Sequence, residues 1–310
     1  MRPSPQSGRS SPACPTRSPA STFESRYLLG DTWPHASTHG PARGSSLLAT
    51  DPERRCLIVG AGRAGGSFAT ALDSVGWTVD LVSSRHLDDI DPEALTRASV
   101  VLLTVADSAI ADVAACLAGR VTDEERVGPA IDGVVAHVSG ACGLDVLAPH
   151  RRVGSLHPLM SLPDRETGAR RLLDRCTFAV DGDPTLTGMV DALGGRPIRI
   201  PASDRMLYHA TASIAANHLT ALCAQVERLA AEVGVPVDAY WALMTTTLEN
   251  ISEVGSTDAL TGPAARADWT TVRSHVAALP DDERLLYLVL CERATELAGH
   301  VLPDDLRVSD

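Results

Sequence analysis

From about residue 54 to residue 200, the chain alternates short apolar runs with segments whose apolar residues recur at helical spacing. Such runs predict strands buried on both faces of a parallel sheet, and the segments between them predict crossover helices. This alternation is typical of a doubly wound, mostly parallel α/β sheet. The runs that we interpret as strands cover residues 56–59, 77–82, 99–105, 133–138, 153–156, 177–180 and 197–200. Helices are expected after the first run, over residues 108–117 and near residues 184–193.

The pattern changes near Pro201, after which only helical periodicity remains. An apolar stripe that includes Ile214, Leu222 and Leu229 predicts a helix over residues 207–233. Further helices are predicted over residues 237–254, 268–279 and 281–300, with Asp268 as the N-cap of the second of these. We therefore predict an α/β domain over residues 53–200 and an all-helical second domain over residues 201–310.

Residues 1–52 are rich in Ser, Pro, Arg and Gly and show no hydrophobic period, which predicts a disordered N-terminal extension. Its Arg and Ser content, with no acidic residue before Glu24, also resembles that of an organelle transit peptide. We favour a dispensable tail or a misassigned upstream start codon, because neither a clear amphipathic helix nor a secretory apolar region is present.

Three glycines at G-x-G-x-x-G spacing, Gly60, Gly62 and Gly65, follow the first apolar run. In a strand–turn–helix unit, the first permits a tight turn, the second lets the backbone approach a pyrophosphate, and the third lets the helix pack on the strand. The free N–H groups and the positive dipole end of that helix would face the phosphates. We expect this loop, with Arg63 and Ala64, to bind a dinucleotide; the alternative is a glycine-rich turn without a ligand.

The end of the second run indicates which dinucleotide is bound. An Asp or Glu there would hold the ribose hydroxyls of NAD, whereas this chain has Ser83, Ser84 and Arg85, and Asp80 lies too early, inside the strand. Two hydroxyls and a guanidinium suit a 2′-phosphate, because they form charge-assisted hydrogen bonds with it. We therefore favour NADP(H) over NAD, with an ordinary polar loop as the alternative.

The third run ends in a segment that would lie beside the nicotinamide ribose, at the carboxyl end of its strand. This segment consists of Thr104, Val105, Ala106 and Asp107. Asp107 is equally suited to be the N-cap of the next helix.

Composition narrows the chemistry. The formal net charge of −12 argues against a nucleic-acid or anionic-membrane surface, and no apolar stretch is long enough to span a membrane. All 27 basic residues are Arg, so no lysine can act as an acid or form a Schiff base. The seven Cys are scattered singly, without metal-ligand spacing, which suggests small buried hydrophobes in a reducing cytoplasm and no metal site.

Ser139 and His157 each follow a predicted strand, at the edge where the reactive face of the cofactor would lie. Hydride transfer to a carbonyl leaves an alkoxide that must be protonated, and a His with a pKa near neutrality can supply that proton. We expect His157 to be the general acid and Ser139 to orient it. A structural role in the core is the alternative for His157.

Three residues of the helical part are candidates for holding the substrate. Asn217 and His209 lie eight residues apart on one helix, about 80° apart in azimuth, and an amide can hold a substrate oxygen. Arg266 could clamp a carboxylate with two hydrogen bonds. The structural alternatives are a helix–helix hydrogen bond for Asn217 and a surface pair between Arg266 and Asp268.

Taken together, these motifs resemble one family, which pairs a Rossmann-like NADP-oxidoreductase domain with a C-terminal helical domain of unknown function. The resemblance covers about residues 54–300. The usual Arg-Gly-Asp of its late motif appears here as Arg266-Ala267-Asp268. The motifs are the glycine loop, Thr-Val-Ala-Asp at 104–107, Ser-Gly at 139–140, Gly-Ser-Leu-His-Pro-Leu at 154–159, the helix with Tyr208, His209 and Asn217, and Leu-Thr-Gly-Pro-x-x-Arg at 260–266.

The resemblance implies an architecture similar to that of ketopantoate reductase, pyrroline-carboxylate reductase and prephenate dehydrogenase, with a helical domain like the C-terminal domain of 6-phosphogluconate dehydrogenase and a homodimer formed through it. Some members look like an alternative ketopantoate reductase, which implies NADPH and a small 2-oxo acid. Ketopantoate reductase proper uses a lysine, which is absent here. His157-Pro158 and Ser139 resemble the His-Pro element and the nearby Ser of prephenate dehydrogenases.

We therefore expect an NADPH-dependent oxidoreductase that reduces a small 2-oxo acid, with 2-dehydropantoate as the leading candidate. A dehydrogenase or reductase of another carbonyl, imine or cyclohexadienol acid is the first alternative. A non-catalytic NADP(H)-binding regulator is the second, and a deazaflavin in place of nicotinamide remains open.

Overall fold

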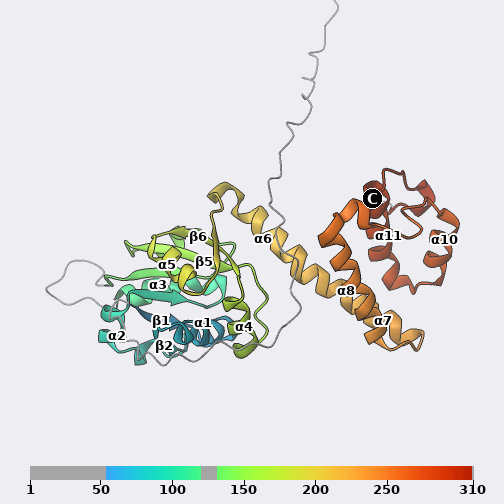
Figure 1. Cartoon of the computed structure of the whole chain (residues 1–310). Coiled ribbons are helices and arrows are strands. Elements are labelled where there is room, and N and C mark those ends of the chain that lie inside the picture. The colour runs from blue at the N-terminus through green and yellow to red at the C-terminus, as the bar shows by residue number, and fades with distance from the viewer. Residues whose placement is uncertain (1–53, 120–130, 309–310) are drawn as a thin grey trace, which may run out of the picture. The chain divides into compact units, whose positions relative to one another are not determined.

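A computed structural model describes residues 54–119 and 131–308, and the predicted N-terminal extension lies outside these ranges. Seven strands form one sheet in the order β2-β1-β3-β4-β5-β6-β7 (Figure 1). All neighbouring strands are parallel except β5 and β6, as expected for a mostly parallel sheet. The strands are β1 (Arg55–Val59), β2 (Thr78–Val82), β3 (Val100–Leu103), β4 (Val134–His137), β5 (Val153–Pro158), β6 (Thr177–Gly182) and β7 (Arg196–Ile198).

Helices cover both faces of the sheet because successive strand residues point to opposite sides. On β1, Ile58 joins an apolar core with α1 (Arg63–Ser74), α4 (Arg165–Leu173) and α5 (Thr185–Ala192). Its neighbours Leu57 and Val59 join a second core with α2 (Pro92–Arg97) and α3 (Ile110–Gly119). The sheet is therefore doubly wound, which confirms the predicted fold class.

Two of these helices were not predicted, because each is short or largely polar. Asp91 caps α2 by accepting a hydrogen bond from the Glu93 amide, and Pro92 occupies its first turn. Helix α4 packs closely on α1 at Gly168, where a Cβ would lie only 2.0 Å from Ser67 Oγ. The close contact therefore requires a glycine at this position.

The last strand ends at Ile198, and the rest of the described chain is helical (Figure 1). The long helix expected over residues 207–233 is present but interrupted by a π-helical turn at Ile214–His218. Asp268 caps α10 as predicted, since its carboxylate accepts a hydrogen bond from the Thr271 amide at 3.1 Å. The helices are α6 (Arg205–Ser213), α7 (Leu219–Glu232), α8 (Val237–Val254), α9 (Ser256–Ala259), α10 (Trp269–Ala278) and α11 (Asp281–Leu297).

The helical part has a small core of its own. Five buried residues form it, and none of them belongs to α8. Within the described chain, no residue of this 18-residue helix is buried, and Leu243 on it is 62% exposed. Among the described helices, none is long and apolar enough to cross a membrane. The five core residues are Ala264, Val272, Cys291, Leu302 and Leu306.

Candidate active site

The glycine loop after β1 is packed so tightly that two of its positions exclude any side chain. Gly60 has a φ of +120°, and a Cβ on it would lie 2.6 Å from the Thr104 carbonyl oxygen. A Cβ on Gly65 would lie 1.9 Å from the Gly60 carbonyl oxygen. At Gly62, by contrast, no described atom beyond the adjoining residues of the chain lies within 4 Å of the Cβ position. The loop is therefore closed against the sheet and open at its middle glycine.

The open side of the loop coincides with the start of α1. Gly62 is the N-cap residue, and no side chain caps the helix. The first intrahelical bond runs from the Gly66 amide to the Gly62 carbonyl, so the preceding amides, including those of Arg63 and Ala64, have no intrahelical partner. Unpaired amides at a positive helix end are suited to bind phosphate. The geometry thus fits a dinucleotide diphosphate.

Thr104 supports this loop from below. Its Oγ1 donates a hydrogen bond to the Gly60 carbonyl at 2.7 Å, and the side chain is buried. Val105 is half-buried, whereas Ala106 and Asp107 are exposed. Asp107 is not the N-cap of α3, because it is the first residue of a 3-10 turn, Asp107–Ala109, which has Ala106 as its N-cap residue and leads into the helix.

Two hydroxyls and a guanidinium follow the carboxyl end of β2, as expected. Ser83 Oγ accepts a hydrogen bond from the Arg85 amide at 3.3 Å, which folds the segment into a turn. Ser83 and Ser84 are half-buried, and Arg85 is exposed. Asp80 lies inside β2, where it pairs with Leu57. The segment carries the groups that a 2′-phosphate needs.

His157 lies within β5 rather than after it, because β5 continues to Pro158 in antiparallel pairing with β6. Its Nδ1 lies 2.7 Å from the Tyr208 hydroxyl of α6, and the two rings meet edge to face. Burial, and next the neighbouring His209, lower the pKa of His157 to about 4. The imidazole is therefore neutral at pH 7, which corrects the expectation of a pKa near neutrality.

Ser139 does not orient His157 in this structure. The Ser139 side chain is buried, and its Oγ accepts hydrogen bonds from the Ala141 and Cys142 amides at 3.1 and 3.0 Å. It therefore closes its own turn after β4. The residue that contacts His157 Nδ1 is Tyr208, 51 positions away in sequence.

His209 approaches the same place from the next residue of α6. A Cβ on Gly140 would lie 2.7 Å from His209 Nδ1 and 2.9 Å from His157 Nε2, so the glycine lets both rings come close. The two ring centroids are 6.0 Å apart. His209 Nδ1 is buried and has no hydrogen-bond partner among the described residues. The structure thus brings His157 and His209 together at Gly140.

A buried arginine fixes α6 to the sheet beside this cluster. Arg205 is 6% exposed and donates hydrogen bonds to Ser155 Oγ and Asp181 Oδ2, each at 3.3 Å. Ser155 and Asp181 pair across β5 and β6, two positions from His157. Sequence reasoning missed Arg205, and it named Tyr208 as part of the family motif without giving it a role. The spacing of three residues, which places them on one helical face, was the available signal.

Asn217 lies in the π-helical turn and is exposed, and its Nδ2 donates to Ser213 Oγ at 3.3 Å. A π-turn holds one more residue than an α-turn, so it rotates the following residues back by up to about 100°. Asn217, the fourth residue of the turn, is therefore expected closer to the face of His209 than the roughly 80° of an uninterrupted α-helix. Because π-turns are frequent at functional sites, the interruption of the helix supports a functional role for Asn217.

Arg266 lies in the turn before α10 and is exposed. Within the described chain it forms no salt bridge with Asp268, whose carboxylate instead accepts hydrogen bonds from Thr271. The alternative role, a direct surface salt bridge, is therefore not formed there, although the charge of Arg266 contributes to the lowered pKa of Asp268 after the hydrogen bonds from Thr271. No described contact joins Arg266 to the cluster around His157.

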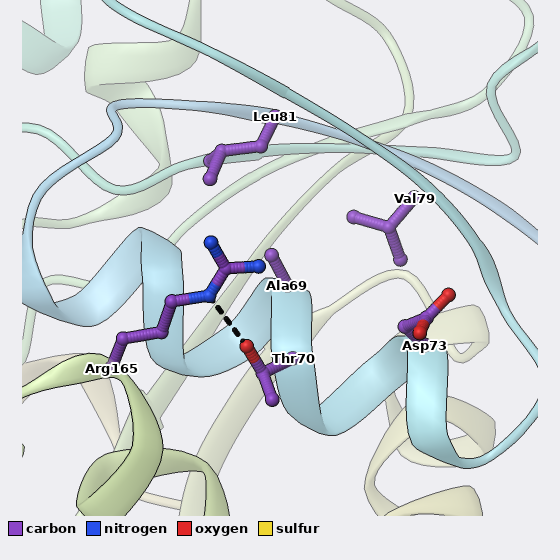
Figure 2. Close-up of a pocket in the computed structure, with 6 residues that line it drawn as sticks. All are labelled: Ala69, Thr70, Asp73, Val79, Leu81 and Arg165. Atoms are coloured by element: carbon purple, nitrogen blue, oxygen red, sulfur yellow. Dashed lines mark hydrogen bonds between the residues drawn. The ribbon is translucent and has the colours of Figure 1, made fainter.

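A pocket of about 300 Å³ lies elsewhere, beside the edge strand β2 (Figure 2). Arg165 reaches over α1 there and donates a hydrogen bond to Thr70 at 2.7 Å. None of the predicted site residues lines this pocket. It is separate from the glycine loop and from His157.

Comparison with known proteins divides the chain in two. Residues 40–163 match a family described as a Rossmann-like domain. Residues 176–294 match a family described as a domain of unknown function, DUF2520. The chain combines a Rossmann-like domain with a DUF2520 domain. None of the curated proteins compared matches its sequence.

Solved structures share this two-domain fold at low sequence identity. A protein from Bacteroides fragilis, described as an NADP oxidoreductase, is 20% identical, with a TM-score of 0.65 over 79% of this chain and 100% of its own. A Thermotoga maritima protein is 23% identical, with a TM-score of 0.58 over 79% and 98%. Pyrroline carboxylate reductase from Plasmodium falciparum, solved with NADP bound, is 8% identical, with a TM-score of 0.51 over 79% and 98%.

Proposed function

We propose that this protein is an NADPH-dependent oxidoreductase that reduces a small 2-oxo acid, with 2-dehydropantoate as the first substrate to test. The observation that carries the proposal is the glycine loop, closed at Gly60 and Gly65 and open at Gly62 over the uncapped start of α1. NADP(H) as the cofactor is in line with the Rossmann-like domain and with neighbours of this fold that were solved with NADP or NADPH.

Two segments would bind different parts of the cofactor: the glycine loop and the residues that follow β2. The glycine loop and the first amides of α1 bind the diphosphate. The groups that bind the 2′-phosphate are Ser83, Ser84 and Arg85. When bound, the dihydronicotinamide supplies a hydride. The protein must then supply a proton, hold the carboxylate and keep the carbonyl oriented.

His157 is the residue that we assign to proton transfer. It is neutral at pH 7, so it would act through a ring N–H rather than as an imidazolium. The partnerless Nδ1 of His209, at the same glycine, is suited to contact a substrate group. Asn217 and Arg266 would hold the carbonyl acid by its oxygens. Ser139, which the sequence suggested as the orienting group, would contribute only through its remaining hydroxyl hydrogen.

The proposal is tested by replacing His157 with Ala. We expect His157→Ala to bind NADPH like the wild type, and to lose turnover by roughly 10²–10⁴-fold, since proton transfer is removed but the glycine loop is untouched. Turnover is measured as loss of NADPH absorbance with a panel of 2-oxo acids and, separately, with imines and cyclohexadienol acids. His275→Ala, which removes an exposed His hydrogen-bonded to Tyr287, is the control.

The outcomes separate the functions. Wild-type consumption of NADPH with a 2-oxo acid supports the reductase, and consumption only with another class redirects the substrate assignment. Tight NADPH binding without turnover on any class would favour a regulator. Near-normal turnover of His157→Ala would remove His157 from the mechanism.

We further propose that the protein forms a homodimer through its helical domain, like the C-terminal domain of 6-phosphogluconate dehydrogenase in the sequence resemblance. The support is the apolar surface that these helices leave open. Leu207 of α6 is 74% exposed, Leu243 of α8 is 62% exposed and Leu285 of α11 is 60% exposed. Large apolar side chains that stay exposed on several helices are candidates for an interaction surface, and a second copy of the chain would cover them.

A further inference from the structure

The hydrogen bond between His157 and Tyr208 is the shortest polar contact of the candidate site with an α6 side chain, and its two partners are fixed independently. His157 is held in the backbone pairing of β5 with β6, opposite Ala179. Tyr208 is held on α6, whose Arg205 is buried against Ser155 and Asp181. The 2.7 Å separation of Nδ1 and the phenolic oxygen is therefore set by a strand and an anchored helix.

The other ring nitrogen of His157 faces the opening that Gly140 creates. Nε2 lies 2.9 Å from the missing Cβ of Gly140, beside the partnerless Nδ1 of His209. A neutral imidazole carries one hydrogen, so the hydrogen-bond partner of one nitrogen decides what the other presents. If the phenol donates to Nδ1, then Nε2 carries the hydrogen and presents it at Gly140.

We propose that Tyr208 is the proton source for reduction, and that His157 relays the proton from Nδ1 to Nε2. The proposal rests on the reductase function proposed above and adds a residue to it. In this arrangement, the Tyr208 hydroxyl donates to His157 Nδ1, and the His157 Nε2–H donates to the substrate oxygen.

The step balances in atoms and charge. The carbonyl carbon would receive the hydride that the bound cofactor supplies, and the π electron pair would move to the carbonyl oxygen. That oxygen takes the Nε2 proton while Nδ1 takes the phenolic proton, so His157 is neutral before and after. A Tyr208 phenolate remains and regains its proton from water. Burial raises the pKa of Tyr208 overall, and the positive charge of Arg205 opposes this rise and so partly stabilises the phenolate.

The charges around His157 favour a neutral relay. Besides burial, His209 and Arg205 from α6 and His137 from β4 oppose its protonation, whereas Asp107, after β3, favours it. A relay of this kind requires a protonated Tyr208, whose pKa is raised by burial. Turnover should therefore stay level across neutral pH and fall only in alkaline solution. A mechanism that used the imidazolium would instead lose rate as the pH rises through about 4.

The test compares Tyr208→Phe with Tyr287→Phe, because Tyr287 contacts His275 Nδ1 at 2.9 Å in a similar edge-to-face pair. The first readout is the ¹⁵N NMR spectrum of the histidine rings at pH 7, with His157 assigned from a His157→Gln variant. We expect hydrogen on Nε2 of His157 in the wild type and in Tyr287→Phe, and a mixture of tautomers in Tyr208→Phe. Hydrogen on Nδ1 in the wild type would overturn the proposal.

The second readout is kinetic. We expect Tyr208→Phe to keep its affinity for NADPH, lose about 10- to 100-fold in kcat, and lose the alkaline fall of the wild-type pH profile, with Tyr287→Phe unchanged. An unchanged kcat or pH profile in Tyr208→Phe would overturn the relay. Failure of the wild type to reduce any substrate would overturn the reductase function instead, while the NMR result would still decide whether Tyr208 is the donor to Nδ1.

Discussion

Arg205 shows how one buried side chain determines the position of several others. A guanidinium that is 6% exposed is stable only when its charge is paired and its N–H groups are bonded, and Asp181 and Ser155 satisfy this need. Both partners lie on the sheet, so the bond fixes the first turn of α6 to β5 and β6. Tyr208, three residues later, therefore meets His157 at a defined distance.

Arg85 offers a test of cofactor choice at a single residue. If its guanidinium reads the 2′-phosphate, Arg85→Ala should weaken NADPH binding by roughly 10- to 100-fold and leave NADH binding almost unchanged, because one charge-assisted contact, worth about 1.5–3 kcal/mol, is lost. Dissociation constants for both cofactors are measured by fluorescence titration. Arg97→Ala, which removes only exposed salt bridges with Asp91 and Glu93, is the control. Equal loss for both cofactors, or a wild type that prefers NADH, would contradict the assignment.

At this scale, sequence could suggest candidates but not their partners. His157 was found because it follows an apolar run and precedes Pro158. Its low pKa could not be predicted, because it arises from burial and from His209, 52 positions along the chain. Sequence also does not show which distant residues meet in the fold. It therefore suggested Ser139 as the residue that orients His157, whereas Tyr208 is the residue that contacts it.

Among the elements, strands were predicted well because a run buried on both faces is apolar throughout. Strand ends are the exception: antiparallel pairing carries β5 through Pro158 and β6 through Gly182, two residues beyond the predicted ends. Strands β3 and β7 each stop two residues before the predicted end. The polar helix α4 was missed, since its position depends on the fit of Gly168 against Ser67 of α1. The hydrophobic pattern of the helix gives no indication of the π-turn at Ile214–His218.

Two glycines of the same loop allow the fold and the cofactor site to be tested separately. Gly62→Ala should leave the melting temperature unchanged, because its backbone suits any residue and no described atom lies near the added Cβ. NADPH binding should weaken at least about 10-fold, since the methyl group occupies the place of the diphosphate. Gly65→Ala should lower both, because its Cβ meets the Gly60 carbonyl oxygen, and such overpacking costs about 1–3 kcal/mol.

Thermal melting and NADPH titration of the two variants decide between the interpretations. Undiminished NADPH binding by Gly62→Ala would place the cofactor elsewhere. Destabilisation by Gly62→Ala equal to that of Gly65→Ala would make the loop a structural turn without a ligand.

For the whole molecule, the two matched domains differ in how they bury apolar surface. The sheet has a full core on each face, whereas the core cluster of the helical part contains only five buried apolar residues among those described. Helical periodicity predicted the helices, but it could not show that the stripe containing Ile214, which is 57% exposed, stays open in the single chain. Helical periodicity shows that one face of a helix is apolar, but it does not show whether other residues of the chain cover that face.

A dimer formed through this surface makes the last prediction. Leu243 on α8 lies about 20° from Val254, which is 55% exposed, so the two share one face of the helix. We expect the wild type to have twice the chain mass of 32.6 kDa in size-exclusion chromatography with light scattering. Leu243→Glu should shift the protein towards monomer, because a buried, unpaired carboxylate costs several kcal/mol at an interface. Thr245→Glu, also exposed but about 200° around α8, should leave the mass unchanged.

Circular dichroism and NADPH titration show whether each variant is folded. A wild type that binds NADPH but is monomeric would show that the protein does not form this dimer. A folded Leu243→Glu variant that remains dimeric would show that the copies contact each other through another surface.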